Sequence, residues 1–301
     1  SFEINSIIKN FPDSTFFASG ILYDLLTLYD IPLTKIKTTQ KPISFAHDKV
    51  RYNLKIGNRY FLFLIPRSIY LKIKKFSEII IHKLFNPEKL NENHKTCLFV
   101  ELPTIRFKEL FLESKNFKEN AVFFSRRRPA IWNFESYSIL KNSNCKIITE
   151  NSLFDKKLEK TVNKGIQQVS TKISTLWKND DQLEKFFSIS GKSLWKVLHP
   201  IFSELINSRI RESVFEIELV KKMFLKYNFN SVLVLSEVGM TEQIVTKFAQ
   251  DNNVPVALLQ MGYHHDTKEA QETNHSQAVY PINADKFVVW GNISKIDAIE
   301  N

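Results

Sequence analysis

Short apolar segments alternate with helix-like segments in two parts of this chain, and this alternation constrains its fold more than any other feature. In the first part, the runs TCLFVE, NAVFFS and CKIIT are separated by amphipathic stretches at 105–115 and 132–140. In the second part, SVLVLS and PVALLQ flank a helical pattern at 241–251, and DKFVVWG follows a polar loop. Because a parallel neighbour can be reached only through a crossover, strands that alternate with single helices predict a parallel α/β sheet.

The rest of the chain has predominantly helical periodicity. Residues 1–93 form a basic region that we expect to be mainly helical, since apolar residues recur at helical spacing between lysines after Pro66. Residues 151–228 read as a helical insertion. The predicted fold is a Rossmann-like parallel sheet flanked by helices over 94–301, with that insertion inside it. The sequence stops within a helical pattern, so we expect the natural protein to continue past residue 301.

Charge is distributed unevenly along the chain. The formal net charge is +10, from 42 Lys and Arg against 32 Asp and Glu. Residues 51–90 hold nine basic and two acidic residues, whereas 231–301 hold four lysines and nine acids. A basic surplus attracts nucleic acid, anionic lipid and phosphorylated ligands alike, so it indicates an anionic partner without choosing among these.

The sequence lacks the motifs of several common classes of enzyme site. The sequence contains no GxSxG, GxxxxGK[ST], HExxH or GxGxxG motif, which removes the main support for hydrolase, P-loop, zinc-protease and standard NAD-binding functions. Its two cysteines, Cys97 and Cys145, lie in apolar runs and favour a reducing compartment, the cytoplasm. The apolar run at 60–66 is too short to cross a bilayer. We predict no metal site and no cofactor, which leaves transfer chemistry or binding.

Three consecutive arginines, Arg126, Arg127 and Arg128, follow the second predicted strand. Ligands of open parallel sheets bind beyond the carboxyl ends of the strands, and guanidinium groups match phosphates and carboxylates in a bidentate manner. We therefore predict that this run binds an anionic substrate. Three neighbours cannot all face inward, and a solvated cluster is an equally good interpretation for two of them.

The strand SVLVLS is followed by Glu237, Gly239 and Thr241. Glu237 is a candidate catalytic base or a ligand of substrate hydroxyls. Gly239 allows a permissive backbone, and Thr241 can cap the following helix, so both are candidate substrate-binding residues. The alternative is that Gly239 and Thr241 only shape a turn and that Glu237 is a solvated loop acid.

The strand PVALLQ leads into Gln260, Gly262, His264 and His265. An imidazole titrates near neutrality, so His264 is a candidate catalytic base and His265 a candidate ligand of the substrate. The alternative is an exposed loop pair. Adjacent histidines without a fitted carboxylate do not form a metal site.

The segments LSEVG, VPVALLQMGYHH and ADKFVVWGNISK together resemble the N-terminal half of GT-B-fold glycosyltransferases of surface-carbohydrate biosynthesis, a wider group that includes CDP-glycerol glycerophosphotransferase-like proteins. The resemblance is most specific over 231–295 and fainter over 96–150. In those families a Gln-His-Gly tripeptide follows the strand. Here Gln260 and Gly262 fit, but Met261 takes the histidine position, so the histidine role is either lost or passes to His264 or His265.

The resemblance implies two facing Rossmann-like domains, the second of which is expected after residue 301. The donor nucleotide would be held mostly by the second domain and the acceptor by the first. It implies transfer of a sugar or phospho-polyol unit from a nucleotide-sugar or CDP-polyol donor, a substrate rather than a cofactor, to a glycan or lipid-linked acceptor. This part alone is then expected to be inactive. Because such enzymes work at the cytoplasmic membrane face, the basic front is expected to bind anionic headgroups peripherally.

Two alternatives remain at this point. The same two-domain layout occurs in nucleotide-sugar epimerases. A different class is a non-catalytic basic module that binds nucleic acid or anionic membrane. Aromatic residues at helical spacing more often form a buried face than a platform for bases, so we do not expect nucleic acid as a partner.

Overall fold

The computed structural model divides into two compact units. One comprises Ser1–Arg67 and Asn163–Glu212, and the other comprises Ser68–Val162 and Ser213–Asn301. The chain passes from one unit to the other at 67/68, 162/163 and 212/213. Within the chain, the structure describes residues 9–11, 16–18, 20–28, 33–35, 49–56, 59–85, 95–178, 180–189, 191–261, 281–292 and 295.

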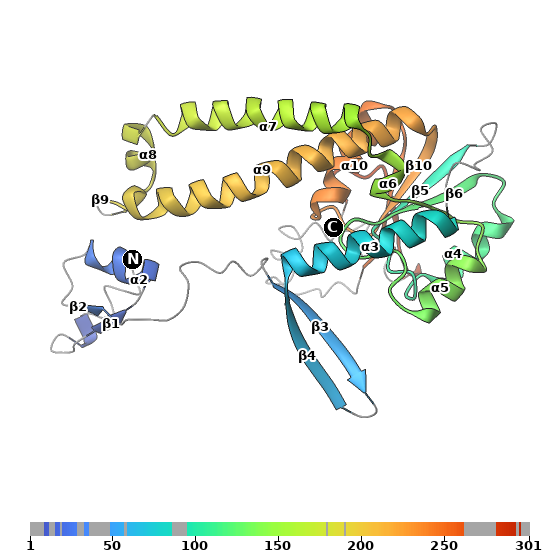
Figure 1. The fold of residues 1–301 in the computed structure, drawn as a ribbon, viewed down its shortest axis with the longest axis horizontal. Coiled ribbons are helices and arrows are strands. Elements are labelled where there is room, and N and C mark those ends of the chain that lie inside the picture. The colour runs from blue at the N-terminus through green and yellow to red at the C-terminus, as the bar shows by residue number, and fades with distance from the viewer. Residues whose placement is uncertain are drawn as a thin grey trace. The chain divides into compact units, whose positions relative to one another are not determined.

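A six-stranded sheet, parallel at every pairing, forms the centre of the second unit (Figure 1). Its spatial order is β12-β11-β10-β5-β6-β7. If the six strands are numbered in chain order and the sheet is read from β7 to β12, this is the order 3-2-1-4-5-6 of Rossmann folds. The predicted Rossmann-like α/β fold is thereby confirmed. The strands are β5 (Thr96–Val100), β6 (Asn120–Phe124), β7 (Lys146–Ile148), β10 (Phe229–Val234), β11 (Val256–Leu259) and β12 (Lys286–Val288).

The crossover helices lie within a few residues of their predicted positions. They are α4 (Lys108–Glu113) with the 3-10 turn η3 (Ser114–Asn116), α5 (Phe134–Lys141) and α10 (Met240–Asp251). The short helix α6 (Glu150–Leu153) follows β7 and leads into the helical insertion. The start of α5 shows why the chain turns there. The backbone N–H of Ser136 donates to Oδ1 of Asn133 at 2.8 Å, and the Asn133 N–H donates to Oγ of Ser136 at 3.1 Å. This reciprocal capping box satisfies donors that a helix start otherwise leaves unpaired.

The helical insertion is confirmed as largely helical. It contains α7 (Lys156–Leu176), α8 (Asp180–Phe186) and α9 (Trp195–Lys226), with the short antiparallel strands β8 (Ser188–Ile189) and β9 (Lys192–Ser193) between the last two. Gly191, at the turn between these strands, has φ of 76°, a conformation that costs glycine little. No helix in the described part of the chain combines the length and the apolar character needed to span a bilayer.

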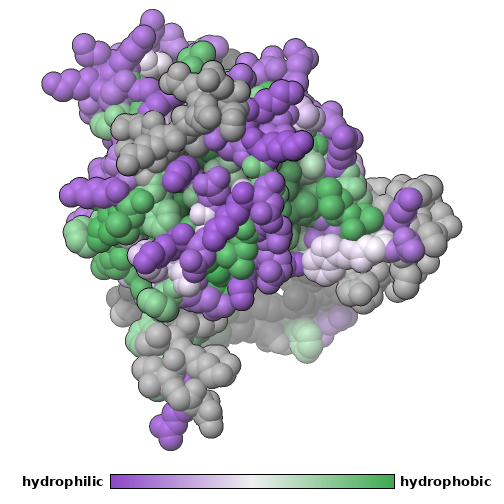
Figure 2. Space-filling view, turned by 90° about the vertical axis from the view of Figure 1, so that its right-hand side faces the viewer, coloured by the Kyte–Doolittle hydropathy of each residue, from purple (hydrophilic) through white to green (hydrophobic). Residues whose placement is uncertain are grey.

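The N-terminal region is less helical than predicted. The aromatic and branched run after Arg59 suits an extended strand, and it forms β4 (Arg59–Pro66), which pairs antiparallel with β3 (Lys49–Ile56). The predicted helix follows as α3 (Arg67–Phe85). The remaining described elements are β1 (Phe16–Ala18), α2 (Gly20–Thr27) and β2 (Leu33–Lys35). Figure 2 shows hydrophobic patches among hydrophilic side chains on one face of the molecule, so apolar groups are not confined to the core.

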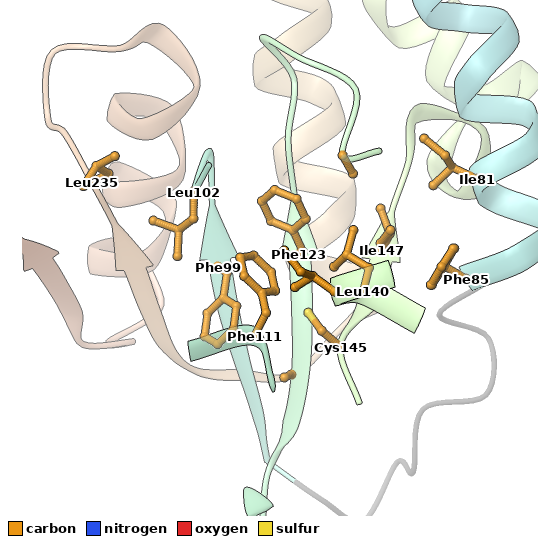
Figure 3. Packing of buried hydrophobic residues seen from close by; sticks show 13 residues of the cluster. Ile81, Phe85, Phe99, Leu102, Phe111, Phe123, Leu140, Cys145, Ile147 and Leu235 are labelled. Carbon is orange, nitrogen blue, oxygen red and sulfur yellow. The ribbon is translucent and has the colours of Figure 1, made fainter. Parts of the chain in front are cut away.

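A hydrophobic cluster of aromatic and aliphatic side chains packs on one face of β5 and β6 in the second unit (Figure 3). The ring of Phe111 meets that of Phe99 edge-on at 5.6 Å and that of Phe123 at 5.2 Å between centroids. Ile81 and Phe85 attach α3 to the same cluster. Each such side chain, when fully buried, contributes about 1.5–3 kcal/mol, so this cluster holds rigid the strand ends from which the site is built.

Candidate functional site

A crevice of about 420 Å3 lies beyond the carboxyl ends of the central strands. The loops that follow β5, β6, β10 and β11 converge there, although the helical insertion separates them in sequence. The strand order reverses between β5 and β10, and this switch point is where open α/β sheets bind ligands. The lining residues are Glu101, Leu102, Pro103, Thr104, Ile105, Arg106, Phe123, Ser125, Arg127, Arg128, Pro129, Trp132, Leu235, Ser236, Val238 and Met261.

Glu101, directly after β5, organises the neighbouring loop. Its φ is 54°, in the left-handed region that a non-glycine residue rarely adopts. Its buried carboxylate accepts hydrogen bonds from the backbone N–H groups of Arg126 and Arg127 and, at 3.3 Å, from the hydroxyl of Ser125. Strained residues of this kind cluster at functional sites because the surrounding structure must hold them in place. Glu101 therefore fixes the backbone that carries the arginine run.

Arg126 points into the protein. Its Nε lies 3.0 Å from Oε2 of Glu216, and its Nη1 lies 3.2 Å from Oε2 of Glu150. Burial alone lowers the pKa of this guanidinium, but the charges of Glu216 and Glu150 outweigh it, so the pKa is raised. Arg126 is absent from the crevice lining, and its contacts are those of a structural ion pair.

Arg127 and Arg128 line the crevice instead. The guanidinium of Arg127 donates from Nη2 to Oε1 of Glu242, and its Nε lies 3.5 Å from Oε2 of Glu101. The Arg127 side chain remains 55% exposed. The hydroxyl of Tyr70 donates to the Arg127 backbone carbonyl at 2.8 Å. Two of the three arginines therefore present their side chains where an anionic ligand can reach them.

Glu242, in the first turn of α10, is the residue that the sequence interpretation missed. It is fully buried, and burial raises its pKa to about 7; Arg127 lowers this pKa and Glu101 raises it. Its Oε2 has no hydrogen-bond partner within the described residues. A Cβ added at Gly239 would overlap this oxygen and lie 2.7 Å from Cδ of Glu242, so glycine leaves the space that the carboxylate fills. The available signal was a glutamate three residues after a helix-starting glycine, a position that favours acids.

Three other predicted residues connect loops rather than line the crevice. The Glu237 carboxylate accepts backbone N–H groups of Ile282 at 2.6 Å and Asn283 at 2.9 Å. The Thr241 hydroxyl donates to Glu216 at 2.9 Å and does not cap α10, whose cap residue is Gly239. The side-chain oxygen of Gln260 accepts the backbone N–H of Trp290 at 2.8 Å. Each of these three side chains therefore has a hydrogen-bond partner within the protein, and their predicted roles at a substrate stay predictions.

The remaining predicted residues follow Met261 in the sequence. Gly262, His264 and His265 lie outside the described residues, so their roles stay predictions. Met261, the last described residue before them, lines the crevice, and its carbonyl accepts a hydrogen bond from Arg106. The Arg106 guanidinium also lies 5.4 Å from the ring centroid of Trp290, within cation–π range.

The arrangement suits an anionic ligand that also carries a flat or apolar part. Arg127 and Arg128 match phosphate or carboxylate oxygens, and the exposed ring of Trp132 offers a face for packing. Within the described ranges, no group of three or more His, Cys, Asp and Glu is placed to hold a metal ion.

The comparisons with known proteins identify no family for this chain. No protein-family model matches the sequence, and no curated protein matches it.

Proposed function

We propose that this chain is the acceptor-side half of a glycosyltransferase-like enzyme that transfers a sugar or phospho-polyol unit from a nucleotide donor to an anionic glycan. The observation that carries the proposal is the arginine-lined crevice at the switch point between β5 and β10. The transfer chemistry is taken from the resemblance over residues 231–295. The crevice adds a place where the phosphates of a donor and the charged groups of an acceptor can be bound together.

In this proposal Arg127 and Glu242 work as a coupled pair. Glu242 is fully buried and does not itself line the crevice. Arg127 is half exposed, so it can turn from Glu242 toward the diphosphate of a donor and open the carboxylate to the acceptor. Because Arg127 holds the pKa of Glu242 down, the carboxylate becomes a stronger base when that charge is drawn away. The acceptor hydroxyl oxygen then attacks the transferred carbon or phosphorus, the bond to the leaving phosphate oxygen breaks, and the hydroxyl proton passes to Glu242. Glu242 thus replaces Glu237 as our candidate carboxylate base, and His264 remains the other candidate.

Isothermal titration of the chain with four ligands tests the proposal: CDP-glycerol, a UDP-sugar, a short polyol-phosphate oligomer and a neutral oligosaccharide of the same length. We expect the phosphate-bearing oligomer to bind and the neutral one to bind weakly. Arg128→Gln should weaken binding by about tenfold, because one charge-assisted contact is lost. Lys118→Gln is the matched control, since Lys118 is an exposed cation that precedes β6 at the opposite end of that strand.

Two results contradict the proposal. The first is that no phosphate-bearing ligand binds. The second is that Arg128→Gln binds as well as the wild-type chain does. Binding of the UDP-sugar without any binding of the oligomer favours the epimerase alternative instead.

A further inference from the structure

Helix α3 buries one ion pair beside its apolar inner residues. Nζ of Lys74 lies 3.0 Å from Oε1 of Glu78, and both side chains are only 6% exposed. Ile81 and Phe85, on the same side of the helix, belong to the hydrophobic core. On the buried face of α3, the charged residues Lys74 and Glu78 are therefore paired with each other, and the apolar residues Ile81 and Phe85 are packed in the core.

The opposite face of α3 is apolar and exposed. Five large hydrophobic side chains follow one another at intervals of four, three, four and four residues, which places them in one stripe along the helix. Each is between 48% and 67% exposed. Contiguous exposed apolar surface marks an interaction site rather than ordinary surface. The stripe consists of Ile69, Ile73, Phe76, Ile80 and Leu84.

Positive charge borders this stripe. Lys72, Lys75 and Lys83 are exposed on α3, whereas the one acidic residue of the fully described stretch 67–85, Glu78, is buried and paired with Lys74. The outward side of the helix therefore combines apolar side chains with uncompensated lysines. A second copy of this face would bring like charges together, whereas an anionic bilayer offers phosphates to the lysines and acyl chains to the stripe.

We infer that the outer face of α3 docks on an anionic lipid bilayer, with the helix axis in the membrane plane, the stripe at the boundary of headgroups and acyl chains, and the lysines at the headgroup phosphates. This inference rests on α3 alone and is independent of the proposed transferase function. The geometry matches that of interfacial amphipathic helices, which bind without crossing the membrane. It also turns a general expectation about a basic N-terminal region into named residues on one helix.

Flotation of the whole chain with lipid vesicles tests the inference. We use phosphatidylcholine vesicles with and without about one-quarter phosphatidylglycerol. The chain should bind the anionic vesicles and bind them less as salt increases, because salt screens exposed charges. Ile73→Asp with Phe76→Asp should reduce partitioning at least about tenfold. Lys72→Glu, Lys75→Glu and Lys83→Glu together should reduce it at least about fivefold per lysine, and only on anionic vesicles.

Leu225→Asp is the control variant, because Leu225 is 81% exposed on α9 and does not belong to the stripe. It should bind vesicles as the wild-type chain does, and unchanged thermal unfolding of every variant shows that folding is intact. The inference fails if the wild-type chain binds neither vesicle or if both sets of α3 variants bind normally. It also fails if light scattering finds a dimer that Phe76→Asp dissociates, or if the lysines bind single-stranded nucleic acid and neither vesicle.

Discussion

The core around β5 and β6 and the outer face of α3 hold the same kinds of side chain in opposite environments. Phe111 has no exposed surface, whereas Phe76 is 67% exposed. The reverse holds for charge, since Lys74 and Glu78 are buried under α3 while lysines flank its apolar stripe. The difference teaches that hydrophobic residues at helical spacing identify a helix but do not tell which face of that helix packs against the rest of the protein.

Truncating one aromatic ring in each region gives the largest contrast. Phe111→Ala should lower the free energy of unfolding by about 3–5 kcal/mol, because it removes packed surface and leaves a cavity. Phe76→Ala should change it by less than about 0.5 kcal/mol, because little is packed against that ring. Urea unfolding at neutral pH measures both values. Equal losses would mean that the α3 stripe is packed within the protein and would remove the contrast.

The buried ion pair of α3 tests the same comparison with charged side chains. Lys74→Met should cost about 3 kcal/mol, because it leaves the Glu78 carboxylate buried without its partner. The double variant Lys74→Met with Glu78→Leu should recover most of this loss, since no charge then stays unpaired. Lys72→Met, an exposed neighbour on the same helix, is the control. A single variant as stable as that control would show that water reaches Glu78.

Glu242, the buried carboxylate beside Arg127, predicts a pH dependence of stability. The pKa of Glu242 is raised from 4.5 to about 7, so the folded state binds its proton more tightly than the unfolded state does. Its contribution to stability is therefore fully present below about pH 4.5 and is lost as the pH rises through about 7, by about 3 kcal/mol in total. Glu242→Gln should remove this part of the dependence. Urea unfolding of both proteins from pH 5 to pH 8 measures the difference, and parallel curves would refute the shift.

The smallest expected effect concerns the space beside that carboxylate. Gly239→Ala should cost about 1 kcal/mol, because its methyl group displaces the Glu242 side chain from its pocket. The same substitution in a Glu242→Ala background should cost almost nothing. The coupling energy of this double-mutant cycle, from urea unfolding of the four proteins, isolates the contact. An additive cycle would mean that Gly239 is needed only as the cap of α10.

Much of the sheet was predictable because its signals are local. The predicted runs TCLFVE, NAVFFS and SVLVLS correspond to β5, β6 and β10, and the helix predicted at 241–251 is α10. The N-terminal region was harder, since the run that forms β4 contains apolar residues compatible with either a strand or a helix. Exposed apolar side chains on α3 were not predicted, because periodicity is the same for a face turned inward and one turned outward.

The sequence predicted which loops form the site, but not which individual residues of those loops line it. The sequence predicted that not all three arginines of the run face the crevice, and the structure places Arg127 and Arg128 there. Glu237 was chosen because it follows a strand, but its carboxylate is occupied by the backbone before β12. Glu242 was passed over because its significance depends on burial and on Arg127, which are both long-range properties.

The sequence by itself determined the alternation of strands and helices, the parallel direction of the strands and the concentration of polar groups at their carboxyl ends, because these follow from interactions between near neighbours. Only the tertiary structure decided that β5 lies beside β10, which arginines face the crevice, which carboxylate is buried with a raised pKa and which side of α3 stays outside. These features arise from strand order and burial, which bring together residues far apart in the chain, and no local pattern encodes such distances.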